Sequence, residues 1–232
     1  MQKGQITLYL VIGVLALIVV SMLMQRPTGA PIVAPQEAMF DDAVNYMRDC
    51  LTQSAQASVD HLALTGDILT ESTVYIKDVP RAIFRGEGDV PTLDAALEMI
   101  REDYLADAVY CSSELPFDYE ITASAPTANL SYSDGRITFY TYYPLTVTSS
   151  GKMRKVFNFA PQIDYTLQEY LDSARLTVGA FLVDPDYLNV TQMNLLPMKY
   201  NLGEMEGNLY DVRLYNESDM NSNYAFAVEV PQ

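Results

Sequence analysis

The chain has 232 residues, of which 49% are hydrophobic, so it holds enough apolar area for the core of one domain or of two small ones. Its formal net charge at pH 7 is −16, from 30 acidic and 14 basic residues. A surface of that sign repels the phosphates of nucleic acids and of anionic lipids, so we expect no nucleic-acid partner.

The N-terminal segment carries the strongest pattern in the chain. From Ile6 to Met24 roughly 19 residues run without a charge, and a helix of that length spans roughly 28 Å, close to the hydrocarbon thickness of a bilayer. We therefore expect a transmembrane helix at residues 5–24. Prolines then favour an extended stalk at residues 25–35, and residues 36–232 follow as an extracellular domain.

Three interpretations of this segment stay open. A secretory signal peptide is cut off behind a shorter apolar core, after small residues, whereas this run ends at Met22–Arg26 without an Ala-x-Ala pattern. An uncut signal anchor would remain on the finished protein. The third interpretation comes from residue order, because Lys3, Gly4 and Gln5 precede the apolar run.

The order Lys3-Gly4-Gln5 before an apolar run resembles the class III signal peptide of archaeal type IV pilin-like proteins. The resemblance implies that a prepilin peptidase cuts between Gly4 and Gln5, which removes residues 1–4 as a cytoplasmic leader and leaves the apolar helix in place. It also implies a cytoplasmic N-terminus and an extracellular domain, and it would allow self-association into a filament through the apolar helix. Tyr9 occupies the position where the bacterial motif usually carries Glu.

A second resemblance extends along about two thirds of the chain. The chain resembles a group of uncharacterised single-anchor proteins of DPANN archaea. The features that carry this resemblance are the run Lys3–Tyr9, the Pro-rich stretch, the Tyr46–Leu51 segment with its Cys, a second Cys after another helix, and Tyr143-Pro144. Members usually carry Gly-Gly where this chain has Thr65–Asp67. The resemblance implies a location at the cell membrane rather than an activity.

Two helices are predicted in the first half of the domain. The first covers Gln36 to Thr65, and Gly66 supplies its C-terminal stop. The second follows Pro91 with Thr92 as its N-cap. Apolar residues recur at steps of three and four in both, namely Phe40, Val44, Met47, Leu51, Ala55, Val59 and Leu62 in the first and Leu93, Ala96, Leu97, Ile100, Tyr104, Leu105 and Val109 in the second.

Strands and a third helix are predicted in the second half. A hairpin is expected around Asp134-Gly135, and Pro144 places part of the following run at an edge or a bulge. A helix is expected from about Pro161 to Val183, and alternating segments at 209–215 and 224–230 predict a C-terminal hairpin. About three helices together with antiparallel strands and hairpins predict an α+β domain behind the transmembrane helix.

Two sets of residues are candidates for covalent modification. Cys50 and Cys111 are expected to form a disulfide because two cysteines in one extracellular domain usually pair, the alternative being two buried free thiols. Asn129, Asn189 and Asn216 each begin an Asn-x-Ser/Thr pattern, so at least one of them is a hypothetical N-glycosylation site.

No residue pattern predicts catalysis. The chain has one histidine, His61, and it lacks a P-loop, a nucleophile elbow and a multi-cysteine metal pattern, so we expect no catalytic residue, no cofactor and no metal ligand. The preferred function is a non-enzymatic, pilin-like surface protein that presents an acidic, Tyr-rich head for adhesion or cell contact. The alternatives are a permanently anchored domain that binds a solute or a partner, and an ectoenzyme such as a carboxylate-based glycosidase.

Overall fold

The computed structural model describes residues 35–66, 73–76, 79–113, 120–149, 151–183, 198–204, 208–217 and 219–230. The chain divides after Met39, and Phe40–Gln232 form one compact unit, to which the following description applies. The predicted leader, the predicted helix at 5–24 and the stalk up to residue 34 lie outside the described residues.

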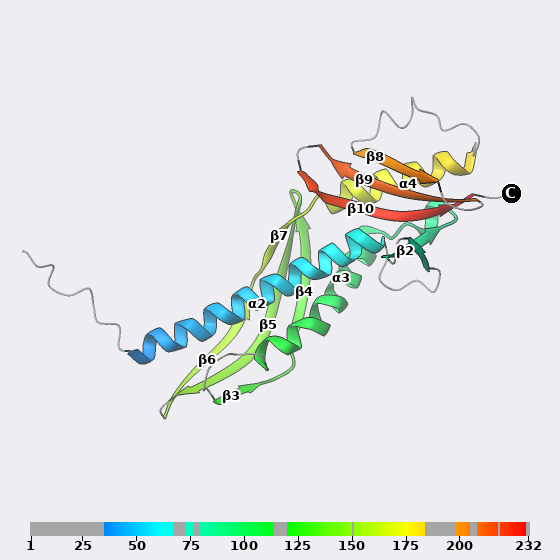
Figure 1. The fold of residues 1–232 in the computed structure, drawn as a ribbon. Coiled ribbons are helices and arrows are strands. Elements are labelled where there is room, and N and C mark those ends of the chain that lie inside the picture. The colour runs from blue at the N-terminus through cyan, green and yellow to red at the C-terminus, as the bar shows by residue number, and fades with distance from the viewer. Residues whose placement is uncertain are drawn as a thin grey trace, which may run out of the picture. The chain divides into compact units, whose positions relative to one another are not determined.

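The predicted fold class needs two corrections. The described part is α+β with the three α-helices α2 (Pro35–Thr65), α3 (Leu93–Ala108) and α4 (Leu167–Val183) (Figure 1). However, among the described residues no helix is both long and apolar enough to cross a membrane, contrary to the predicted fold class. The sheets are also not purely antiparallel, because one of them contains a parallel pair of strands.

Helix α2 packs one apolar stripe into the core and ends where the sequence predicts. Met47, Leu51 and Val59 lie on that stripe and are almost fully buried. Gly66 adopts a φ of 79°, a left-handed conformation that favours glycine, and its N–H donates to the carbonyl oxygen of Leu62 at 2.8 Å. A side chain could not replace its hydrogen, because an added Cβ would lie 2.8 Å from the carbonyl oxygen of Ala225.

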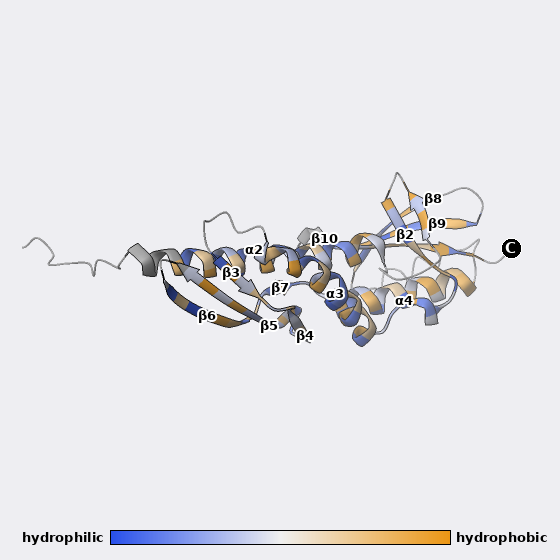
Figure 2. Cartoon of the chain, turned by 90° about the horizontal axis from the view of Figure 1, so that it is seen from below, coloured by the Kyte–Doolittle hydropathy of each residue, from blue (hydrophilic) through white to orange (hydrophobic). Residues whose placement is uncertain are grey.

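Helix α3 begins at the predicted cap. The hydroxyl of Thr92 accepts from the N–H of Ala95 at 3.3 Å. Buried Ile100 and Tyr104 face the core, whereas Val109, expected on the same stripe, is 48% exposed in the short 3₁₀ helix η2 (Val109–Ser112). Blue and orange residues alternate along α2, α3 and α4, as amphipathic helices require (Figure 2).

One of the two five-stranded sheets, called the larger sheet because its strands hold slightly more residues, is antiparallel and is built around one long strand, β5 (Arg136–Ser149). On one side β5 pairs with β3 (Glu120–Ala123) and β4 (Thr127–Ser133), and on the other with β6 (Lys152–Phe159) and β7 (Gln162–Asp164). The predicted hairpin is present, since β4 and β5 meet at Asp134-Gly135, and both turn residues have positive φ, as a tight type I′ turn requires.

Prolines interrupt this sheet at three places. Pro126 separates β3 from β4, and Pro161 separates β6 from β7, because proline has no N–H to donate to the ladder. Pro144 lies inside β5, where the register with β6 shifts between Tyr142 and Leu145. The predicted bulge is therefore present.

The residues of β5 alternate between a buried and a solvent-facing side. Ile137, Phe139 and Tyr143 point into the core, where the hydroxyl of Tyr143 donates to the carbonyl oxygen of Val109 at 3.2 Å. The hydroxyls of Tyr104 in α3 and Thr141 in β5 lie 2.8 Å apart. Helices therefore cover one face of this sheet, and its other face stays open to solvent.

The second sheet has the strand order β1-β2-β10-β9-β8. Strands β8 (Lys199–Glu204), β9 (Leu209–Asn216) and β10 (Asp219–Glu229) are antiparallel, which includes the predicted C-terminal hairpin. Strand β1 (Thr73–Ile76) pairs antiparallel with β2 (Val79–Phe84), and β2 pairs in parallel with β10. No local pattern predicts that parallel pair, because its two strands are far apart in the chain.

The start of the third helix also differs from the prediction. Helix α4 begins at Leu167, whereas the sequence favours a start near Pro161. The residues in between form β7, where Ile163 lies opposite Ile137 of β5 and is buried. Pairing with β5 satisfies backbone groups and buries an apolar side chain, so tertiary contacts override the helical periodicity there.

Candidate interaction surface

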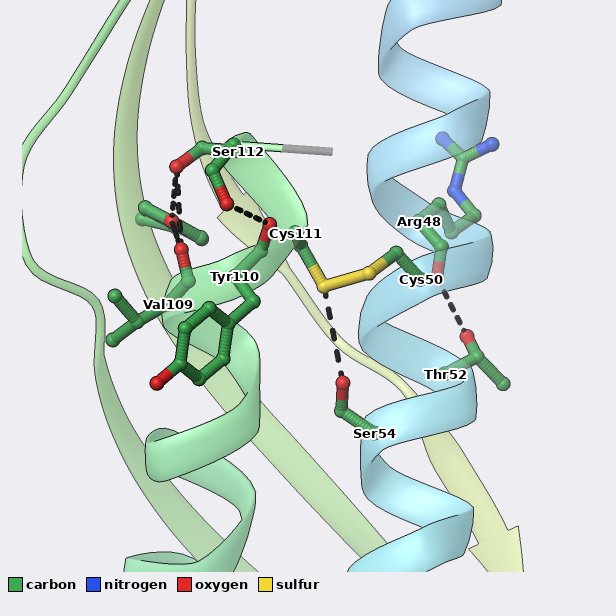
Figure 3. Close-up of a disulfide and its surroundings, with 10 residues drawn as sticks. Arg48, Cys50, Thr52, Ser54, Val109, Tyr110, Cys111 and Ser112 are labelled. Carbon is green, nitrogen blue, oxygen red and sulfur yellow. Dashed lines mark hydrogen bonds between the residues drawn. A yellow bond between two sulfur atoms is a disulfide. The ribbon is translucent and has the colours of Figure 1, made fainter. Parts of the chain in front are cut away.

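The two cysteines are joined in the structure. Cys50 on α2 and Cys111 on η2 form a disulfide, with their Cα atoms 5.8 Å apart (Figure 3). The hydroxyl of Ser54 lies 3.8 Å from the sulfur of Cys111, one turn further along α2. The bond therefore joins α2 to the end of α3 and holds both helices on the same face of the larger sheet.

The other predicted site residues do not come together. Asn129 is exposed on β4, Asn216 is half-buried at the end of β9, and Asn189 lies outside the described residues, as do Gly4 and Gln5. Within the described ranges no group of three or more His, Cys, Asp or Glu side chains is arranged to hold a metal ion.

The single histidine makes a contact between two helices. Nδ1 of His61 on α2 lies 3.1 Å from a carboxylate oxygen of Asp103 on α3, and the His61 side chain is 47% exposed. A pair that is open to water on one side holds its partners weakly. It contributes a modest link between the helices, near the surface.

A buried ionic cluster has a structural role. Arg81 on β2 is 2% exposed, and its Nη1 donates to the carbonyl oxygens of Leu64 and Pro80. Its Nε lies 3.5 Å from Asp211, which also accepts from Arg213 at 3.2 Å. Burial lowers the pKa of the Arg81 guanidinium, and the neighbouring Asp211 opposes that change. The cation lies at the C-terminal end of α2, where the helix dipole favours positive charge.

A polar groove lies between α3 and β4. It has a volume of about 390 Å³, and its lining includes the two carboxylates Asp94 and Glu98 together with Arg101 and Asn129. The hydrogen bond from Arg101 lowers the pKa of Glu98 and so favours the charged form of that carboxylate.

The open face of the larger sheet exposes a cluster of aromatic rings, which we name the aromatic shelf and define as Tyr140, Tyr142 and Phe157. The three residues are 58%, 50% and 41% exposed. The rings of Tyr142 and Phe157 are nearly parallel, with an interplanar angle of 9° and centroids 6.2 Å apart. Single exposed aromatic residues are common, whereas a cluster on one face is typical of surfaces that contact a partner or ligand.

The shelf adjoins a depression in the sheet. The depression has a volume of about 360 Å³, and its lining includes Tyr140, Tyr142, Asn158 and Ala160. It lies where β6 ends and the chain turns into Pro161, whose carbonyl oxygen accepts from the N–H of Phe139 at 2.9 Å. The same break that shortens the edge strand therefore leaves space beside the rings.

Comparison of the chain with protein-family models, with curated proteins and with solved structures yields no match. The role of the shelf is therefore inferred from the side chains that form and border it.

Uncharged polar side chains border the shelf. Register places Asn129 of β4 opposite Tyr140, and Thr127 of β4 and Asn158 of β6 on either side of Tyr142. None of these bordering residues is a carboxylate, although the chain has 30 acidic residues. The residues that register places directly beside the two tyrosines are thus uncharged, whereas charged side chains follow farther off, among them Lys155 on β6 and the carboxylates of the groove that Asn129 also lines.

Sequence reasoning missed the shelf for an identifiable reason. Alternation along β5 predicts which residues share a face, but not which face the helices cover. Tyr140, Tyr142 and Tyr143 are adjacent or nearly so in sequence, and only Tyr143 is buried. Two exposed tyrosines at positions i and i+2 of a strand are the one signal that points to such a surface.

Proposed function

We propose that this chain is a non-enzymatic, pilin-like protein and that its apolar N-terminal segment attaches it to the membrane. The unit Phe40–Gln232 would then be displayed outside the cell for adhesion or cell contact. The observation that carries the proposal is the open sheet face, whose clustered rings are exposed on a scaffold braced from behind by helices. The position of Lys3, Gly4 and Gln5 before the apolar run supports attachment and processing.

The disulfide supports a location outside the cytoplasm. Disulfides persist in oxidising compartments and are rare where thiols are kept reduced. The bond Cys50–Cys111 joins two helices of one unit and is the kind of brace that extracellular domains use. The absence of charge from Ile6 to Met24 supports insertion of that segment into lipid.

N-terminal sequencing of the protein from isolated membranes tests the proposal. Gln5 as the first residue supports prepilin processing, and Met1 supports an uncut anchor. A first residue beyond Arg26 on a freely soluble product would overturn the proposal. External protease added to intact cells should digest the protein, whereas a cytoplasmic protein of the same cells stays whole.

A second candidate is a permanently anchored domain that binds a solute or a partner and never polymerises. The depression beside Tyr140 and Tyr142 favours it, because a concave surface suits a small ligand. Electron microscopy of material sheared from the cell surface separates the two. Filaments that contain this chain favour the pilin-like role, and a chain that stays entirely with the membrane favours the second candidate.

A further inference from the structure

We propose that the aromatic shelf binds an uncharged carbohydrate and that Tyr140, Tyr142 and Phe157 supply the stacking surface. The inference rests on the proposed function, since it names the chemical class of partner that the open face would contact.

The rings of the shelf match the apolar side of a sugar. A pyranose ring presents C–H groups on its face and hydroxyl groups around its edge. Tyr142 and Phe157 offer two nearly parallel rings from neighbouring strands, and Tyr140 adds a third, two residues along β5. Aromatic rings of this kind provide large contact areas at a low cost in conformational entropy.

The border of the shelf matches the polar edge of a sugar. The amides of Asn129 and Asn158 and the hydroxyl of Thr127 both donate and accept hydrogen bonds, as sugar hydroxyls do. The two tyrosine hydroxyls add the same capacity. Contacts between neutral groups avoid the desolvation cost that a buried charge would bring.

Charge decides which carbohydrate fits. With a net charge of −16, the chain repels anionic polysaccharides at long range. The depression beside the rings has no charged residue in its described lining, so it selects neither a cationic nor an anionic ligand. A neutral polysaccharide can approach the shelf without repulsion from the negative charge of the chain.

The same argument disfavours a second copy of this chain on the shelf. Two chains that meet would bring two net charges of −16 together, and their repulsion is strongest at low salt. The volume of the depression, about 360 Å³, lies near the lower end of the range for small-ligand pockets.

The test uses the full chain in micelles of a zwitterionic detergent, because glycoside detergents would compete for the site. The probes are neutral hexasaccharides of glucose, mannose and N-acetylglucosamine, with an oligogalacturonate as the acidic control. Binding is followed by saturation-transfer NMR and by calorimetric titration. We expect one or more neutral hexasaccharides to bind and the oligogalacturonate not to bind.

Three variants locate the binding on the shelf. Tyr142→Ala should weaken the affinity roughly tenfold, the usual loss for one interface anchor. Tyr142→Phe keeps the ring and should stay within roughly threefold of the parent chain. The matched control is Tyr75→Ala on β1, because Tyr75 is 71% exposed but lies in the other sheet, and its affinity should not change.

Folding is checked by thermal unfolding of each variant, and the exposed side chains replaced here should leave the midpoint unchanged. Lack of binding by every neutral hexasaccharide would overturn the inference. So would a preference for the acidic oligosaccharide, or an affinity that Tyr142→Ala leaves intact. Loss of self-association in Tyr142→Ala, measured by sedimentation, would assign the shelf to a second copy and would also overturn it.

The failure of this inference is distinguishable from the failure of the proposed function. Oligosaccharide binding is measured on purified protein and does not depend on processing or on location in the cell. N-terminal sequencing and surface digestion do not depend on the shelf. A chain that is displayed at the surface but binds no neutral sugar would refute the inference alone.

Discussion

At the residue scale, buried polar side chains join elements that lie far apart in the sequence. Arg81 connects the last turn of α2 to β9 by donating to Leu64 and pairing with Asp211. The hydroxyl of Tyr224 donates to the carbonyl oxygen of Gly66 at 2.6 Å, next to the same helix end. The C-terminal carbonyls of α2, which no helix can satisfy by itself, thus find donors in the second sheet.

Tyr104 should make the protein sensitive to alkali. Burial, the main cause, raises the pKa of Tyr104 from its usual value of 10.0 to about 12. Between these values the unfolded chain loses the proton and the folded chain keeps it, so the free energy of unfolding falls as pH rises from 10 through 12. The loss from this one group is about 3 kcal/mol.

Chemical unfolding at several pH values measures this effect. Tyr104→Phe should reduce the decline above pH 10, of which buried Tyr165 with its raised pKa keeps a share, and it should cost about 1 kcal/mol at neutral pH because it removes the hydrogen bond with Thr141. Tyr75→Phe, at an exposed position, is the control and should keep the parent profile. An alkaline decline that Tyr104→Phe leaves unchanged would contradict the assignment.

At the element scale, the helices on the larger sheet are held by packing and by one covalent bond. The carboxylate of Asp41 on α2 accepts from Arg154 on β6 at 2.5 Å, but both side chains are exposed, so this pair contributes little. The disulfide Cys50–Cys111 spans 61 residues, and closing so long a loop reduces the entropy of the unfolded chain.

Replacement of both cysteines by serine should lower the free energy of unfolding by about 4 kcal/mol. Reduction of the parent chain should cause a similar loss, which serves as the matched control because it leaves the sequence unchanged. Equal stability of the oxidised parent and the double variant would contradict the expectation. Thiol titration of denatured, unreduced protein should detect no free thiol, whereas two free thiols would show that the bond is absent.

At the scale of the whole molecule, the excess of acidic residues dominates. With a net charge of −16, the excess carboxylates repel one another when the chain is compact. Strand β6 departs from this pattern, since Lys152, Arg154 and Lys155 line an edge of the larger sheet. Charged side chains on an edge strand oppose pairing with another sheet. The charges on β6 therefore protect this edge strand against pairing with another sheet.

Screening of this repulsion should stabilise the fold. Raising the salt concentration from about 0.01 M to about 0.5 M shortens the range of the repulsion, so the melting temperature should rise. Differential scanning calorimetry of the full chain in detergent measures the change, and an uncharged osmolyte at matched osmolality controls for effects other than screening. A melting temperature that falls with salt would mean that attractive ion pairs outweigh the net repulsion.

Features that depend on neighbouring residues could be derived from the sequence alone. The stop of α2 at Gly66, the cap at Thr92 and the turn at Asp134-Gly135 follow from local backbone preferences. The partnership of Cys50 with Cys111 follows from there being only two cysteines.

Tertiary structure decided the features whose partners lie far along the chain. The backbone of Ile163 is extended because it pairs with β5, although its spacing suits a helix. The parallel contact between β2 and β10 arises from packing and has no local signal. Which tyrosines remain exposed was settled by the face of β5 that the helices cover, since side chains alternate equally well either way.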